Sequence, residues 1–334
     1  MKTIQITSPG AFALVEKELP LPGPFQVRIK VKATGICHSD SYTVLGTFPG
    51  VTYPRIPGHE IAGIIDAVGQ GVYSWKKDQR VGVGWAGIRC RRCQACRRGD
   101  FILCQNHQIT GIHYDGGYAE YMIASVESLA ALPDEISFEE AAPLLCAGVT
   151  TFNALRNSQA RPGDLVAIQS IGGLGHLAIQ FANKMGFKTV AISKGAEKEE
   201  LAVRLGAHIY INSEKENAAE ELSKLNGAKV ILATAPSGKA ISTLIDGLGN
   251  NGQLLVVGSS NEPIQVTSMQ LIRKRCAICG WPSGTAFDSE NALQFCAQTG
   301  IRPMIETFAL EKAQEAYQHM MDNKARFRSV LKFD

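Results

Sequence analysis

The sequence has no stretch of about 18 uncharged apolar residues, the length that a membrane-spanning helix requires. Its first residues, MKTIQITSPG, lack the basic start and the long apolar run of a signal peptide. The net charge of +3 is small for 334 residues, so neither nucleic acid nor an anionic membrane is an expected partner. Repeats and low-complexity runs are also missing. We therefore expect a folded, cytoplasmic protein.

The chain length predicts two domains, at roughly 150 residues each. Up to about residue 145, short β-type runs are broken by Gly and Pro, as in Val27–Val31 and Ile61–Ile65. From about residue 148, apolar strands alternate with amphipathic helices, which is the rhythm of βαβ units and of an α/β fold with a parallel sheet. The strands of this second part are expected at Leu165–Gln169, Thr189–Ser193, Ile209–Ile211, Val230–Thr234, Gln253–Gly258 and Ala277–Gly280.

Helix signals are fewer and clearer. The first strand of the second part should be followed by a helix over Gly173–Met185, which Gly186 would end. Beyond residue 280 the alternation stops. The last fifty residues carry one clear helix, Leu310–Asp322, and a terminal strand, Ser329–Phe333, which we expect to pack on the first domain.

Four of the nine cysteines, Cys90, Cys93, Cys96 and Cys104, lie within fifteen residues. In a reducing compartment this clustering favours a metal over disulfides. Four thiolates complete a tetrahedron and leave no open position, so such a zinc would be structural. An iron–sulfur cluster is the rival, but the familiar run has Pro after its last Cys, where this chain has Gln105.

Several arginines surround these cysteines and could suggest a nucleic-acid finger. We favour a different role, because a zinc with four thiolates carries a formal charge of about −2 that guanidinium groups offset. No helix with base-reading residues follows. The arginines concerned are Arg89, Arg91, Arg92, Arg97 and Arg98.

Three further potential ligands, Cys37, His59 and Cys146, are scattered over more than a hundred residues. Two thiolates and one imidazole would leave the fourth position of a zinc free, as catalysis requires. Spacing alone does not establish this shell, because a lone His or Cys is more often a packed core residue.

Four motifs occur in one order along the chain: GICHSD at 35–40, GHE at 58–60, APLLCAG at 142–148 and IGGLGH at 171–176. Together with the four-cysteine loop they closely resemble the zinc-containing alcohol dehydrogenases of the medium-chain dehydrogenase/reductase superfamily, from end to end. The resemblance implies a β-rich GroES-like catalytic domain, 1–146 with 281–334, and an inserted Rossmann-type dinucleotide domain with a doubly wound parallel sheet, 147–280.

The resemblance also implies residue roles. Cys37, His59 and Cys146 would hold a catalytic zinc, with Glu60 behind it as an exchanging ligand and Asp40 orienting His59. An alcohol in the open position of such a zinc would lose its proton readily before hydride leaves its carbon. The remaining implied site residues are Ser39 in a proton relay, His38 at the cofactor, and Phe48 and Trp85 in a narrow substrate pocket. Tyr42 stands where the family often has a relay histidine, and a phenol is a poor base at neutral pH.

The run from Ser170 to Gly175 lies between a strand and a helix, where glycines let a pyrophosphate approach the backbone. Ser170 occupies the first glycine position, and Ser193 with Lys194 replaces the acidic residue that would select NAD. We expect NADP(H) rather than NAD(H), although the missing carboxylate permits either. The assigned cofactor residues are Gly172, Gly173, Leu174, Gly175, Ser193 and Lys194, with Arg328 implied by the resemblance as a phosphate contact.

The sequence therefore predicts an NAD(P)-dependent dehydrogenase with two zincs per chain, one catalytic and one structural, acting on a primary or small secondary alcohol or its aldehyde. The resemblance implies a homotetramer or homodimer. A zinc-free quinone or enoyl reductase of the same superfamily is one alternative, and the set of Cys37, His59 and Cys146 argues against it. A non-catalytic, zinc-stabilised binding or sensor protein is the other, and we interpret Cys276, Cys279 and Cys296 as structural in each case.

Overall fold

The computed structural model describes all residues 1–334 and divides the chain into two compact units. Unit 1 comprises Met1–Val149 and Gly284–Asp334, and unit 2 comprises Thr150–Ser283. Both boundaries fall three residues after those expected from the sequence. Helical residues run without a break through the first boundary, so no Gly- or Pro-rich linker marks it.

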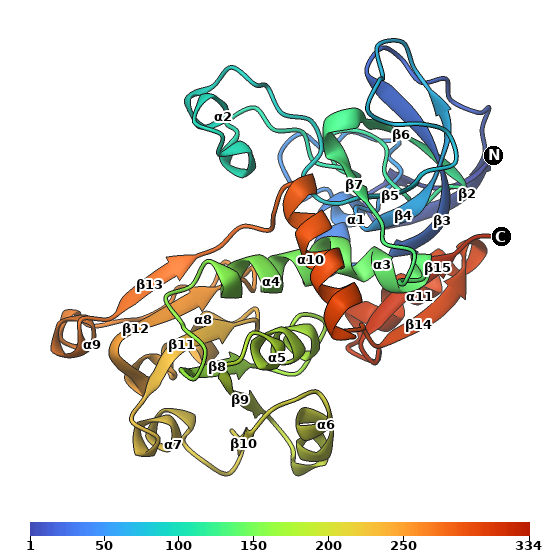
Figure 1. The fold of residues 1–334 in the computed structure, drawn as a ribbon. Coiled ribbons are helices and arrows are strands. Elements are labelled where there is room, and N and C mark those ends of the chain that lie inside the picture. Colours follow the sequence, from blue (N-terminus) through green and yellow to red (C-terminus); the bar gives the residue numbers. More distant parts are fainter. The chain divides into compact units, whose positions relative to one another are not determined.

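Unit 2 is built on a six-stranded sheet in the order β10-β9-β8-β11-β12-β13, all parallel (Figure 1). Numbered within the unit, this order is 3-2-1-4-5-6, the doubly wound arrangement of dinucleotide-binding folds. The strands are β8 (Leu165–Gln169), β9 (Lys188–Ser193), β10 (Ile209–Asn212), β11 (Ala228–Ala233), β12 (Leu248–Val256) and β13 (Ala277–Gly280). All six strands were predicted, because strands buried on both faces are continuous apolar runs.

Helices connect these strands. The predicted helix after β8 is α5, which begins two residues later than expected and ends as expected before Gly186, whose φ is 82°. The helices of this part of the chain are α4 (Val149–Arg156), α5 (Gly175–Lys184), η5 (Ala196–Lys198), α6 (Glu199–Arg204), α7 (Ala218–Lys224), α8 (Gly238–Ser242), η6 (Ile245–Gly247) and α9 (Ser268–Lys274).

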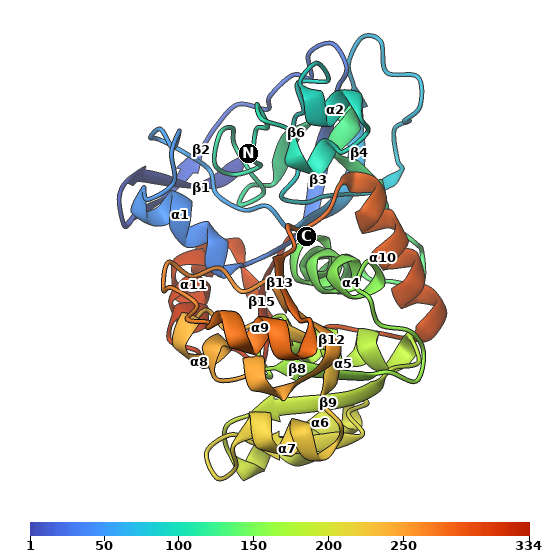
Figure 2. The same ribbon diagram turned by 90° about the vertical axis from the view of Figure 1, so that its left-hand side faces the viewer.

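Unit 1 contains a seven-stranded sheet in the order β14-β15-β3-β4-β5-β7, with β6 paired to β3, and a separate hairpin of β1 and β2. Figure 2 shows α1 beside this hairpin, and the amide of Gly10 donates to the carbonyl of Val44 at 2.7 Å. The strands are β1 (Lys2–Ser8), β2 (Ala11–Glu16), β3 (Gln26–Gly35), β4 (Ile61–Val68), β5 (Arg80–Val83), β6 (Tyr121–Ser125), β7 (Leu129–Ala131), β14 (Ile305–Ala309) and β15 (Arg328–Lys332).

The central pair of this sheet brings two distant motifs together. Alternate residues of β3, Val27, Ile29 and Val31, are fully buried and fix its register in the core. Antiparallel pairing then sets Thr34 opposite Ile61. The motif that follows β3 and the motif that precedes β4 therefore meet at one edge of the sheet.

The helices of unit 1 include one that the sequence analysis missed. Only one helix was expected after residue 280, and it is present as η7 and α11, but α10 covers fourteen further residues. The remaining helices of unit 1 are η1 (His38–Asp40), α1 (Ser41–Leu45), α2 (Gln94–Arg97), η2 (Phe101–Leu103), η3 (Val126–Ser128), α3 (Phe138–Pro143), η4 (Leu144–Gly148), α10 (Ala286–Thr299), η7 (Leu310–Lys312) and α11 (Ala313–Met321). None of the helices combines the length and apolar character that crossing a bilayer requires.

The expectation of a single helix was wrong because α10 buries little that is strongly apolar. Its buried positions include Ala292, Leu293 and Cys296, a weak periodic signal. Its ends were nevertheless marked: Thr285 and Asp288 form a capping box, and Gly300 ends the helix with φ 75°. End signals therefore located this helix better than hydrophobic periodicity did.

Because the Thr285 hydroxyl accepts from the Asp288 amide at 3.3 Å, Thr285→Ala should lower the free energy of unfolding by about 1 kcal/mol. For a domain of this size the melting temperature should fall by roughly 2–4 °C. Gln294→Ala, on the exposed face of the same helix, is the control and should change stability by less than about 0.5 kcal/mol. Equal melting temperatures of Thr285→Ala and the parent would contradict the capping role.

Candidate active site and metal centres

Four potential metal ligands converge in unit 1: Cys37, His59, Glu60 and Cys146, whose ligand atoms all lie within 4.8 Å of one another. Cys37 follows β3, and His59 and Glu60 precede β4, so the β3–β4 pairing places them together. Cys146 lies on η4, a wide π-helical turn of the kind that often marks functional positions. The structure thus assembles the three ligands that the sequence left scattered.

The two sulfurs of this cluster are spaced as a shared ion requires. Sγ of Cys37 lies 3.9 Å from Sγ of Cys146, and both cysteines are free. A tetrahedral zinc with Zn–S bonds of about 2.3 Å separates its sulfurs by about 3.8 Å. The thiol contact itself lowers the pKa of Cys37 and raises the pKa of Cys146, because one sulfur holds the proton that the other shares. Both can ionise together only with a cation between them.

His59 is oriented for metal binding. Its Nδ1 lies 2.9 Å from Oδ1 of Asp40, while its Nε2 is buried and has no hydrogen-bond partner. Burial disfavours the imidazolium, but the charge and hydrogen bond of Asp40 raise the pKa of His59 well above its usual value. An Nδ1–H bonded to the carboxylate leaves the Nε2 lone pair for an ion, which fits the orienting role predicted for Asp40.

Glu60 is fully buried and has only one cationic neighbour. Its Oε1 accepts from Nη2 of Arg328, and its Oε2, in the ligand cluster, has no partner. Burial raises the pKa of Glu60 to about 8, although the Arg328 guanidinium opposes this shift. Gly35 leaves room for the carboxylate, because a Cβ there would overlap Oε2.

Arg328 is placed differently from the expectation. The sequence analysis assigned it to a cofactor phosphate, whereas its guanidinium is buried in unit 1 and donates to Glu60 and to the carbonyl of Ile36 at 3.2 Å. This pairing was not anticipated, because it joins residues 268 positions apart. The phosphate contact stays a prediction.

Aromatic rings surround His59 on one side. The Trp85 ring packs edge-on against the His59 imidazole with centroids 4.9 Å apart, and Phe48 lies 6.2 Å from Trp85. Tyr42 contacts both, at 5.4 Å from Phe48 and 6.5 Å from Trp85. His113, which the sequence analysis did not single out, touches Phe48 at 6.1 Å. The two residues predicted for a substrate pocket therefore lie beside the ligand cluster.

The two other predicted residues of the GICHSD motif lie on η1, the single turn directly after Cys37. His38 is exposed and Ser39 is partly exposed. The turn itself is held by the carboxylate of Asp40, whose Oδ2 accepts from the Cys37 amide at 2.9 Å. The relay role of Ser39 and the cofactor role of His38 stay predictions.

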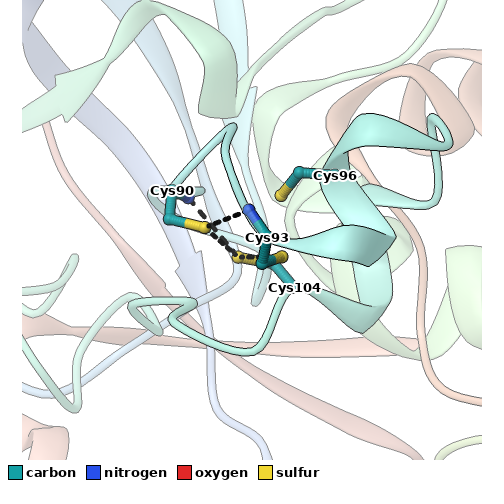
Figure 3. Close-up of side chains that lie close together, drawn as sticks. All are labelled: Cys90, Cys93, Cys96 and Cys104. Carbon is teal, nitrogen blue, oxygen red and sulfur yellow. Dashed lines mark hydrogen bonds between the residues drawn. The ribbon is translucent and has the colours of Figure 1, made fainter.

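The four-cysteine loop forms a second cluster, away from the first in the chain (Figure 3). Sulfur–sulfur distances are 3.6 Å between Cys104 and Cys90 and 4.0 Å between Cys93 and Cys104. These distances match the edges of a tetrahedron around one ion, whereas a multi-iron cluster would spread its thiolates over several metals. The geometry therefore favours zinc over the iron–sulfur alternative.

Backbone amides prepare this loop for anionic sulfur. The amide of Cys93 donates to Sγ of Cys90 at 3.4 Å, and such amide bonds from Arg92 and Cys93 lower the pKa of Cys90 to about 5. Burial instead raises the pKa of Cys96 to about 12. A bound cation removes this conflict by stabilising all four thiolates. Arg89, buried among them, offsets their charge as expected.

The predicted phosphate turn lies in unit 2 between β8 and α5. Ser170, at the first glycine position of the fingerprint, has φ 75°, a left-handed conformation that explains why glycine is usual there. Gly175 lies so close to the carbonyl of Ser170 that a Cβ would overlap it. Gly172, by contrast, faces open space, with its nearest neighbour 3.9 Å from a built Cβ. Strand, tight turn and helix thus occur in the order that pyrophosphate binding requires.

Comparison with known proteins agrees with this geometry. The alcohol dehydrogenase GroES-like domain matches residues 23–134, and the zinc-binding dehydrogenase domain matches residues 173–298. An alcohol dehydrogenase of Penicillium expansum is 46% identical over 322 residues, covering 96% of this chain and 94% of its own length. The chain belongs to the zinc-type medium-chain alcohol dehydrogenases.

Other members of this alcohol dehydrogenase family are similarly close over the whole chain. One from Geobacillus stearothermophilus is 38% identical over 321 residues, covering 96% of this chain and 95% of its own length. A solved structure, the cobalt and zinc bound thermostable alcohol dehydrogenase from Pyrobaculum aerophilum, superposes with a TM-score of 0.89 at 26% identity and covers 100% of this chain and 99% of its own. This alcohol dehydrogenase interconverts alcohols and aldehydes with NAD(P), and nothing in the comparisons favours the reductase or sensor alternatives.

If the two clusters hold separate ions, each can be emptied alone. Cys146→Ser should reduce the zinc content of the dehydrogenase from two to one per chain and abolish turnover, with little loss of stability. Metal analysis and an alcohol oxidation assay on the same sample check this outcome. Loss of both zincs from Cys146→Ser would contradict the independence of the clusters.

Cys96→Ser should act on the other cluster. Because that zinc ties down the loop, its loss should lower the melting temperature by at least about 5 °C and remove metal from the loop. Thermal unfolding with metal analysis measures both effects. An unchanged melting temperature in a protein that has lost this zinc would show that the loop is not stabilised by metal.

Proposed function

We propose that this dehydrogenase depends on a zinc held by Cys37, His59 and Cys146, with a second, structural zinc on the four-cysteine loop. The observation that supports it best is the buried Nε2 of His59, without a partner, beside two sulfurs 3.9 Å apart. A zinc with an open position polarises the oxygen of an alcohol or aldehyde and lowers the pKa of a hydroxyl. Glu60 lies within the same cluster and supplies a fourth, exchanging oxygen.

The residues around the cluster would position substrate and protons. Ser39 would accept the proton of the substrate hydroxyl and begin the relay, because it stands two residues after Cys37 on η1. Phe48 and Trp85 would exclude water and bulky groups beside His59, which favours primary or small secondary alcohols. Tyr42 packs with both rings, so we assign it to this aromatic wall rather than to the relay.

A panel of alcohols, assayed with metal analysis, tests the zinc dependence. Ethanol, benzyl alcohol and a bulky secondary alcohol should be oxidised in falling order of rate by the protein with two zincs. Removing one zinc with a chelator while the loop zinc stays should abolish turnover, and zinc should restore it. Full turnover without the exchangeable zinc would refute the proposal.

The proposed cofactor preference is NADP(H). Ser193, at the end of β9, is buried, and the neighbouring Lys194 is exposed and free to attract a 2′-phosphate. Nearby, the carboxylate of Glu197 folds so closely over Gly195 that a Cβ there would lie 2.2 Å from it. The balance between this cation and this anion decides the preference that we propose.

Side-by-side kinetics with NADH and NADPH and one aldehyde measure it. Lys194→Ala should raise the KM for NADPH by about tenfold, equivalent to about 1.4 kcal/mol, and leave the KM for NADH nearly unchanged. Glu197→Gln is the matched control, and it should lower the KM for NADPH or leave it constant. A parent enzyme that prefers NADH would overturn the assignment.

We also propose a homo-oligomer that uses the β13 edge of unit 2. β13 pairs only with β12, so its outer edge offers free backbone groups, and its residues carry neither charge nor proline. Next to it, α9 exposes Ile272 by 69% and Met269 by 53%. A second copy pairing at this edge would cover both features.

Ile272→Lys should therefore lower the molar mass measured by size-exclusion chromatography with light scattering. Val203→Lys, which changes a residue exposed by 57% on α6, is the control and should leave the oligomer intact. An unchanged mass for Ile272→Lys would exclude this edge as the interface.

A further inference from the structure

Tyr118, which no motif singled out, is fully buried next to the ligand cluster of unit 1. Its hydroxyl donates to Oδ2 of Asp40 at 3.0 Å. The same oxygen accepts from the Cys37 amide at 2.9 Å, and the other oxygen of Asp40 lies 2.9 Å from Nδ1 of His59. One carboxylate therefore links the tyrosine to two of the three proposed zinc ligands.

The backbone of Tyr118 reaches the same place by a second route. Its amide donates to the carbonyl of Pro57 at 3.0 Å, and the amide of Gly117 donates to the carbonyl of Gly58 at 3.1 Å. Gly58 has φ 99°, and a Cβ there would lie 2.5 Å from the Tyr118 ring. The ring thus packs flush against the residue that precedes His59.

The protonation of this tyrosine suits a permanent donor. Burial, and then the charge of Asp40, raise the pKa of Tyr118 well above its usual value. The hydroxyl therefore keeps its proton and donates to Asp40 at any working pH. With two donors on Oδ2, Asp40 is held in the one rotamer that presents Oδ1 to His59.

We infer that Tyr118 is a positioning residue for the catalytic metal, holding His59 and Cys37 in ligand geometry through Asp40 and through its ring on Gly58. This inference rests on the proposed zinc site. Partners of this kind typically contribute 10–100-fold to metal affinity, so the hydroxyl should slow zinc loss from this cluster and leave the four-cysteine loop unaffected.

Tyr118→Phe tests it, because phenylalanine keeps the ring against Gly58 and removes only the hydroxyl. The zinc-loaded protein is mixed with a chelator, and zinc release is followed over time by metal analysis of the retained protein. The variant should release one zinc at least about tenfold faster than the parent and hold the loop zinc equally long. The cobalt-substituted variant should also show shifted visible absorption bands, since these report ligand geometry.

Tyr114→Phe is the matched control. Tyr114 is also shielded from water and hydrogen-bonded through its hydroxyl, to Thr110 at 2.7 Å, but it has no bond to Asp40. Its zinc release and cobalt spectrum should equal those of the parent. Equal release rates and spectra for Tyr118→Phe and Tyr114→Phe would overturn the inference.

A double-variant cycle guards against a general loss of stability. Asp40→Asn should release the same zinc faster still, and adding Tyr118→Phe to it should change little, because the tyrosine acts through Asp40. Additive effects, or loss of the loop zinc as well, would show that Tyr118 acts by core packing alone. A parent that holds no zinc at the first cluster would refute the proposed function itself, which is a distinguishable result.

Discussion

The organisation of unit 1 depends on the desolvation of several acidic groups at one point. Two thiols, an imidazole and a carboxylate share a volume from which water is excluded, and only the guanidinium of Arg328 offsets their charge. Buried charges are costly unless they are paired or bound to a metal. The opposed pKa shifts of Cys37 and Cys146 express this cost in the chain without an ion. A divalent cation is the component that makes the arrangement stable.

The rest of unit 1 brings these groups together with little freedom. The register of β3 and β4 fixes where two motifs meet, and glycines at Gly35 and Gly58 create the space in which Glu60 and Tyr118 fit. Hydrogen bonds from Asp40 and Arg328 then orient the side chains. Backbone geometry, rather than side-chain flexibility, determines the distances between the sulfurs and the imidazole.

Much of this could be predicted from the sequence, and the failures have physical causes. The strands of unit 2 are continuous apolar runs, so local pattern was sufficient to find them. The four-cysteine loop was also predictable, because its ligands lie close together in the chain. Cys37, His59 and Cys146 required the family resemblance, since no local signal tells a ligand from a core residue. Their convergence comes from strand pairing across the sheet.

Contacts between distant positions were not accessible in this way. Arg328 was interpreted as a phosphate contact because the sequence could not show that β15 pairs with β3 and brings it to Glu60. Tyr118 was overlooked for the same reason, and α10 because its buried face is made largely of small residues. Each of these depends on tertiary packing rather than on periodicity or spacing.

The π-helical turn that carries Cys146 has an evolutionary consequence. Such a turn contains one residue more than a regular α-helical turn, and helical residues flank it on both sides. Deleting a single codon within Leu144–Gly148 would restore a regular helix and rotate Cys146 by about 100° relative to the helix before it. The sulfur would then leave the cluster while the helices persisted, so a descendant without this metal is only one small genetic event away.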